Sequence, residues 1–151
     1  MRLVASGIQP ARIMDGPIIA RPEPITRSGV AAHLGMAADA IAAALHRWNQ
    51  HPYAATGQML QHAELELDDA FPGLISYLPS QNPLWNVLAQ ARDGVHAMSL
   101  QYFAGELPGS AATVPYVLAR YTYDVRMAQA LLIGVGSTLV DPASGYTASG
   151  E

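Results

Sequence analysis

Histidines and carboxylates stand at helical spacing in two segments of this chain, and metal sites and acid–base pairs are built from these residue types. His62 and Glu66 are four residues apart and Asp93 and His96 are three apart, so each pair would share one face of a helix. These four side chains are the candidates for an enzyme or a ligand- or metal-binding bundle. However, the sequence has neither Glu-x-x-His nor His-Glu-x-x-His, which di-iron bundles and zinc proteases use. We therefore expect no metal, cofactor or catalytic residue here. The expected arrangement is a solvated helix surface for Glu64, Glu66, Asp68 and Asp69, with partly buried or capping roles for His33, His46 and His51.

Other catalytic and phosphate-binding motifs are absent from the sequence. There is no Gly-x-Ser-x-Gly, and Ser99 has no neighbouring base beyond His96. The chain has no cysteine, which excludes disulfides, thiolate metal sites and cysteine nucleophiles. All eight basic residues are arginine, so a Gly-Lys-Ser/Thr phosphate loop cannot form. With a formal net charge of −4 and no basic run, nucleic acid is not expected as a partner.

The composition indicates a folded chain with a partner surface. The 151 residues amount to one domain on the usual range, and 50% of them are hydrophobic. Only 13% are charged, whereas soluble domains average about 25%. A monomer with so few charged residues would have to expose apolar side chains to water. We therefore expect part of this apolar surface to be covered by association with another molecule.

Two helices are predicted in the first half, after an extended arm over residues 1–28 that contains four prolines. Capped by Thr26 or Ser28, the first helix is expected over 29–50, with an apolar face formed by Val30, Leu34, Ala37, Ile41, Leu45 and Trp48. The second is expected over 53–71 and should stop at Pro72-Gly73. A connector over 73–83 follows, the best candidate for an internal boundary of the helical domain 29–139.

The second half carries the sharpest periodicity, which predicts two more helices. One follows Asn82-Pro83 over 84–102, and the other spans 114–139, each with apolar residues at alternating steps of four and three. A Pro/Gly bend at 107–110 between them predicts an antiparallel helical hairpin. The fold class is therefore all-α, with four helices and a loose tail over 140–151. Steps of this kind in the last helix predict a partner-binding stripe: Leu118, Tyr121, Val125, Ala128, Leu132, Val135 and Leu139.

The C-terminal hairpin also resembles the inner-rod and needle subunits of type III secretion systems. The resemblance lies in the bend Leu107-Pro108-Gly109-Ser110 and in a last helix that contains Tyr121 to Gln129 followed by Gly134 to Leu139. It covers less than half of the chain. In those families an extended N-terminal region precedes a helical hairpin whose last helix packs into a helical tube. The tail after residue 139 and the two helices in the first half depart from that pattern.

These observations favour a non-enzymatic structural or assembly protein that forms a homo-oligomer or packs with the subunits of a larger assembly. An inner-rod-like component of a bacterial secretion apparatus is the more specific form of this hypothesis. A phage virion adaptor or tail subunit and the helical-bundle enzyme described above are the alternatives. The longest apolar stretch, 128–140, is interrupted by polar and glycine residues, so no membrane-spanning helix is predicted. Residues 1–9 do not have the pattern of a signal peptide, and the sequence assigns no compartment.

Overall fold

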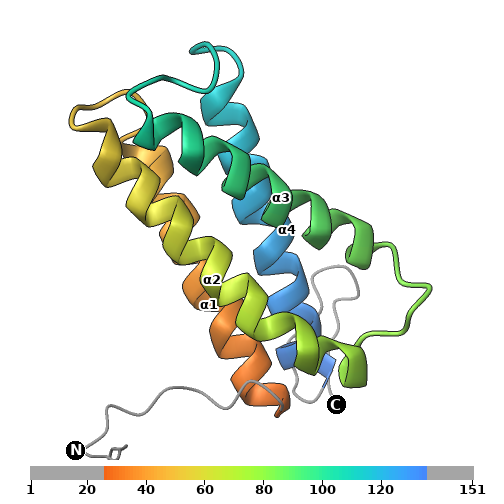
Figure 1. Ribbon diagram of the computed structural model, residues 1–151. Helices are drawn as coiled ribbons and strands as arrows, with labels where there is room; N and C mark the ends of the chain where they lie inside the picture. The colour runs from red at the N-terminus through yellow and green to blue at the C-terminus, as the bar shows by residue number, and fades with distance from the viewer. Residues whose placement is uncertain (1–25, 136–151) are drawn as a thin grey trace, which may run out of the picture.

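The computed structural model describes residues 26–135, and this part of the chain is all-α. It contains four helices and no strand: α1 (Arg27–His46), α2 (Tyr53–Tyr77), α3 (Leu84–Phe103) and α4 (Val114–Val135) (Figure 1). The predicted fold class is thereby confirmed. The predicted arm, except for its last residues, and the predicted tail lie outside the described residues.

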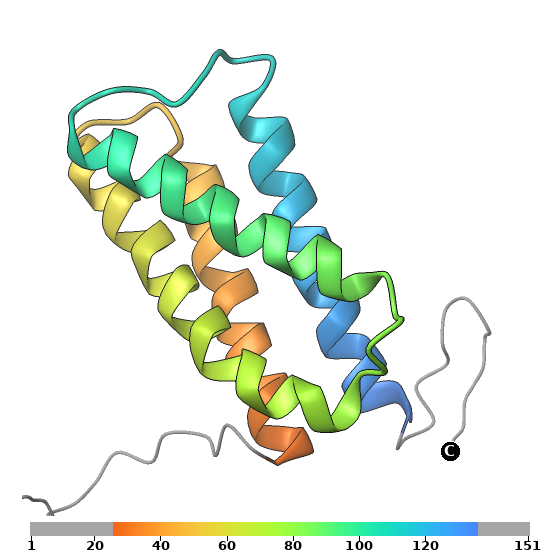
Figure 2. The ribbon, with the colours of Figure 1, turned by 45° about the vertical axis from the view of Figure 1, so that its right-hand side comes forward.

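The helices form an antiparallel four-helix bundle in which successive helices run in opposite directions (Figure 1). Helix α1 packs extensively against both α2 and α4, and α2 packs extensively against α3. The contact between α3 and α4 is much smaller. Figure 2 shows α1 behind, between α2 and α4, with α3 crossing the front. The last two helices are therefore not an isolated hairpin, because each packs mainly against a helix of the first half.

Small residues allow α1 to sit at the centre of this packing. The hydroxyl of Thr26 accepts a hydrogen bond from Gly29 N at 2.9 Å and caps the helix, as predicted. Val30, Leu34 and Ile41 are fully buried, together with several alanines that permit close approach of neighbouring helices. Every apolar atom removed from water in this way contributes to the stability of the bundle.

Helix α1 ends four residues earlier than predicted, at His46. The cause is a turn held by Arg47, whose Nε donates to Thr56 Oγ1 at 3.1 Å and whose Nη2 donates to Pro52 O at 3.1 Å. Trp48 consequently lies in the turn, and its carbonyl accepts a 2.5 Å hydrogen bond from the hydroxyl of Tyr102 on α3. Burial of that hydroxyl raises the pKa of Tyr102 to about 12.

Helix α2 continues through Pro72, so the predicted stop at Pro72-Gly73 is wrong. A proline inside a helix removes one backbone hydrogen bond and normally ends or kinks the helix. Here the proline ring lies on the exposed side, whereas Leu74 and Leu78 beyond it are buried in the core. Packing of these two leucines outweighs the lost hydrogen bond. The true connector between α2 and α3 is therefore shorter than the predicted 73–83.

The second half follows the predicted periodicity closely. Asn82 Oδ1 accepts a hydrogen bond from Leu84 N at 2.8 Å at the start of α3. Within α3 the buried apolar side chains follow the predicted alternating steps of three and four: Leu88, Ala91, Val95, Met98 and Tyr102. Leu84, at the start of this series, is partly buried. A loop over 104–113 contains the predicted bend and leads into α4. Within this loop the hydroxyl of Thr113 accepts a hydrogen bond from Ser110 N, and the hydroxyl of Ser110 accepts one from Ala112 N.

One described helix, α1, is long and apolar enough to span a membrane by length and composition. No membrane-spanning helix was expected from the sequence. Of the apolar window in α1, 56% is buried inside the bundle. Core helices of soluble bundles share this combination of high hydropathy and burial.

Candidate functional site

The four predicted site residues His62, Glu66, Asp93 and His96 do not surround a common cavity. Glu66 faces α1, where its carboxylate meets the side chain of His33. His96 and Asp93, on α3, take partners of their own. The structure thus joins one half of the predicted set, His62 with Glu66, to a residue that was assigned only a generic buried role.

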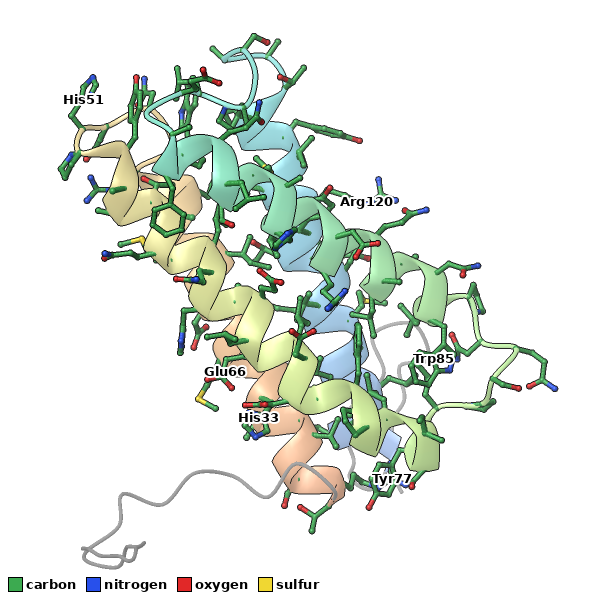
Figure 3. All side chains as sticks on the ribbon, in the orientation of Figure 1. His33, His51, Glu66, Tyr77, Trp85 and Arg120 are labelled. Atoms are coloured by element: carbon green, nitrogen blue, oxygen red, sulfur yellow. The ribbon has the colours of Figure 1, made fainter. Side chains whose placement is uncertain are left out.

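The pair formed by His33 and Glu66 is the most deeply buried polar contact that the structure describes between helices. His33 Nδ1 lies 2.5 Å from Glu66 Oε1, and the two residues are 1% and 3% exposed. Figure 3 shows the two side chains together between α1 and α2. Ionisable groups are rarely this buried without strong mutual hydrogen bonding, because desolvation penalises the charged forms.

Two further groups on α2 adjoin this pair. His62 Nε2 lies 3.6 Å from Glu66 Oε2, one turn before it in the helix. Asp69 follows Glu66 by three residues, and ligand atoms of His33, Glu66 and Asp69 all lie within 4.8 Å of one another. Positions 62, 66 and 69 therefore share one face of α2, with His33 opposite. We call these four residues the α1–α2 cluster.

Sequence reasoning missed His33 as a member of this cluster, although a signal was present. Position 33 lies three residues after Val30 and four before Ala37, both on the predicted buried face of α1. A histidine in that register must find a polar partner inside the bundle.

A second histidine–glutamate pair joins α2 to α3. His96 Nδ1 lies 3.0 Å from Glu64 Oε1, and the side chain of His96 is 53% exposed. Arg92 contacts Asp68 of α2 and Asp93 of α3 beside this pair. The hydrogen bond that Arg92 donates to Asp68 raises the pKa of Arg92, and the charges of Asp68, Asp93 and Glu64 add to the effect. This exposed group is a network of ion pairs with a permanent cation.

Ser99 takes no part in a nucleophile–base arrangement. Its hydroxyl donates to the backbone carbonyl of His96 at 2.7 Å, as is common for serine inside a helix. The imidazole of His96 is engaged with Glu64.

A hollow of about 290 Å³ lies where α3 and α4 diverge. Its lining includes Met98, Val117 and Tyr121, and contains no histidine, arginine or carboxylate among the described residues. The hydroxyl of Tyr121 lies against Gly94, where an added Cβ would clash with it. Burial raises the pKa of Tyr121, so the phenol stays protonated. Such a lining offers mainly apolar contact, with the phenol of Tyr121 as its titratable group.

The predicted partner-binding stripe lies largely inside the chain's own core. Buried members are Leu118, Val125, Ala128 and Leu132, and Tyr121 is partly buried beside them. The side chain of Val135 and all of Leu139 lie outside the described residues. In the described bundle α1 covers the side of α4 that the heptad pattern marked as apolar, so the buried members pack within the chain itself.

The opposite side of α4 carries a second set of large apolar side chains. Tyr116, Tyr123, Met127 and Leu131 are between 38% and 64% exposed. Their spacing of seven, four and four residues places them on one face, which we call the α4 outer face. Arg120 lies within this face, and its Nε donates to Asp124 Oδ1 at 3.3 Å. Hydrogen bonding to Asp124 and, to a smaller extent, to Tyr116 raises the pKa of Arg120.

Comparison with protein-family models, curated proteins and solved structures found no match to this chain.

Proposed function

We propose that this chain is a non-enzymatic assembly protein that self-associates through the α4 outer face. The observation that carries the proposal is the row of four large, exposed apolar side chains on α4, opposite the face that α4 buries against α1. A helix that is apolar on both sides is typical of one that lies between two packed layers. In a single copy of the described bundle, only one of those layers exists.

The residue types of this face support a protein contact. Tyrosine, methionine and arginine are enriched in interfaces, and tyrosine supplies a large contact area with few rotatable bonds. Tyr116, Tyr123, Met127 and Arg120 are of these types. The low charge of the whole chain points the same way, since it leaves few groups that resist burial.

The charges on the α4 outer face permit contact between two copies. Arg120 is bonded to Asp124 of the same helix, so its charge is balanced within each copy. Arg126 on the flank is similarly paired with Asp39 of α1 at 2.8 Å. Two such faces can meet without like-charge repulsion, which otherwise disfavours contact between identical surfaces.

Light scattering with size-exclusion chromatography over a range of protein concentrations tests this proposal. The wild-type chain is expected to form oligomers, and Tyr123→Asp and Met127→Asp are expected to shift it towards monomer by placing unpaired carboxylates in the contact. Leu65→Asp is the matched control, because Leu65 is about as exposed as Tyr123 but lies on α2. A wild-type chain that is monomeric at all concentrations, or variants that assemble as the wild type does, would contradict the proposal.

The shape of the assembly distinguishes its two more specific forms. An inner-rod-like component of a secretion apparatus would build a helical tube, whereas a virion adaptor would build a closed ring. Negative-stain images of the purified assembly separate these outcomes.

A further inference from the structure

We propose that the α1–α2 cluster binds one divalent transition-metal ion of the zinc class, with His33, Glu66 and Asp69 as ligands and His62 as the fourth. This inference is independent of the proposed assembly function, because the cluster and the α4 outer face lie on different helices.

Convergence of the donor atoms is the first support for this site. In tetrahedral zinc sites the nitrogen and oxygen ligands lie about 2.0–2.2 Å from the ion, which places them roughly 3.3 Å from one another. Ligand atoms of His33, Glu66 and Asp69 already lie within 4.8 Å of one another. His33 Nδ1 and Glu66 Oε1, at 2.5 Å, would have to part by roughly 0.8 Å for both to reach that ligand spacing.

The chemistry of the donors selects the class of ion. Imidazole nitrogen together with carboxylate oxygen suits zinc and its neighbours, whereas calcium and magnesium prefer sites made of oxygen alone. Two carboxylates, from Glu66 and Asp69, would balance the charge of a divalent ion in this largely buried place.

Access for the ion comes from the α2 side of the cluster. His33 and Glu66 are buried, but the side chain of His62 is 56% exposed and Asp69 also reaches solvent. The cluster therefore consists of a buried pair, His33 and Glu66, and a solvent-accessible pair, His62 and Asp69. A buried ion pair is weak evidence for a purely stabilising role, since such a pair can often be replaced by apolar residues without loss.

The exposed pair of His96 and Glu64 is a natural comparison within the same molecule. It has the same two residue types at hydrogen-bond distance, but the guanidinium of Arg92 lies beside it and disfavours a second cation. Within residues 26–135, no other group of three histidine or acidic side chains converges as the α1–α2 cluster does.

Isothermal titration of the chelator-treated, full-length protein with zinc chloride tests the site, and cobalt chloride provides an absorption spectrum that reports ligand geometry. We expect one ion per chain and a thermal midpoint that rises with zinc. Glu66→Gln keeps a hydrogen-bond acceptor for His33 and should weaken binding by more than about 100-fold, because even changes outside the ligand shell cost 10–100-fold. Asp69→Asn, at the mouth of the cluster, tests the site even if Glu66→Gln does not fold.

His96→Gln and Glu64→Gln are the matched controls and should bind zinc as the wild type does. Absence of zinc binding by the wild-type protein would overturn the proposal. So would equal affinity in Asp69→Asn, loss of binding in the His96→Gln control, or a stoichiometry of one ion per two chains that disappears in Tyr123→Asp.

Discussion

Two glutamates on α2, only two residues apart, each pair with a histidine of a neighbouring helix, yet their surroundings differ sharply. Glu66 meets His33 of α1 in the core, and Glu64 meets His96 of α3 in contact with solvent. Residues two apart on a helix point in nearly opposite directions, so α2 presents one glutamate to each neighbour. The comparison shows that the same two residue types can stand in different surroundings. The His33–Glu66 pair is buried, with His62 and Asp69 at its edge, whereas the His96–Glu64 pair is reached by solvent and lies beside the guanidinium of Arg92.

The largest expected difference between the two pairs is in stability. Glu66→Ala removes the carboxylate from the buried imidazole of His33 and should lower the free energy of unfolding by about 3–5 kcal/mol. Glu64→Ala should lower it by about 1 kcal/mol at most, because exposed pairs contribute little. Urea denaturation followed by circular dichroism measures both values. Equal losses in the two variants would show that the burial of Glu66 does not increase its contribution to the free energy of unfolding.

Replacing both members of the buried pair gives a smaller expected effect. The double variant His33→Leu, Glu66→Leu removes both polar groups, and it should be more stable than Glu66→Ala by about 1–4 kcal/mol because no desolvated partner remains. The same urea experiment measures it. If the double variant were no more stable than the single one, the pair would be required for the fold, and its burial would give no support to a metal-binding role.

Salt should produce the smallest effect, and only on the exposed pair. The Debye length falls to about 3 Å at 1 M salt, so the interaction of Glu64 with His96 and Arg92 is screened. We expect the stability difference between the wild type and Glu64→Gln to vanish between 0.02 M and 1 M sodium chloride, while that for Glu66→Gln persists. A loss for Glu66→Gln that disappears with added salt would indicate that water reaches the α1–α2 cluster freely.

The spacing of apolar residues predicted the core of the bundle well, because each helix buries one face and the residues on that face are apolar. Val30, Leu34 and Ile41 of α1 and Leu88 and Val95 of α3 are buried as their spacing indicated. Helix ends were harder to predict where tertiary contacts decide them. Arg47 closes a turn that ends α1 early, and the burial of Leu74 carries α2 past its proline.

The candidate sites were only partly predictable, for two physical reasons. A heptad stripe indicates that one face of α4 is covered but does not reveal whether α1 or another molecule covers it, and the buried stripe was therefore assigned to a partner. Similarly, His62 and Glu66 are neighbours within one helix and were paired from spacing, whereas His33 lies 33 residues away from Glu66. Only the packing of α1 against α2 brings that pair together.

The proline within α2 has a consequence for local motion. Pro72 has no amide hydrogen, so it cannot donate the usual helical hydrogen bond to the carbonyl of Asp68. The turns that end at Tyr77 are therefore joined to the rest of α2 by one hydrogen bond fewer. The burial of Leu74 and Leu78 and the stacking of the Arg27 guanidinium on the Tyr77 ring hold these turns in place. We therefore expect these turns to open as a unit while the centre of α2 stays closed, so deuterium should replace the amide hydrogens of residues 75–77 well before those of residues 63–70.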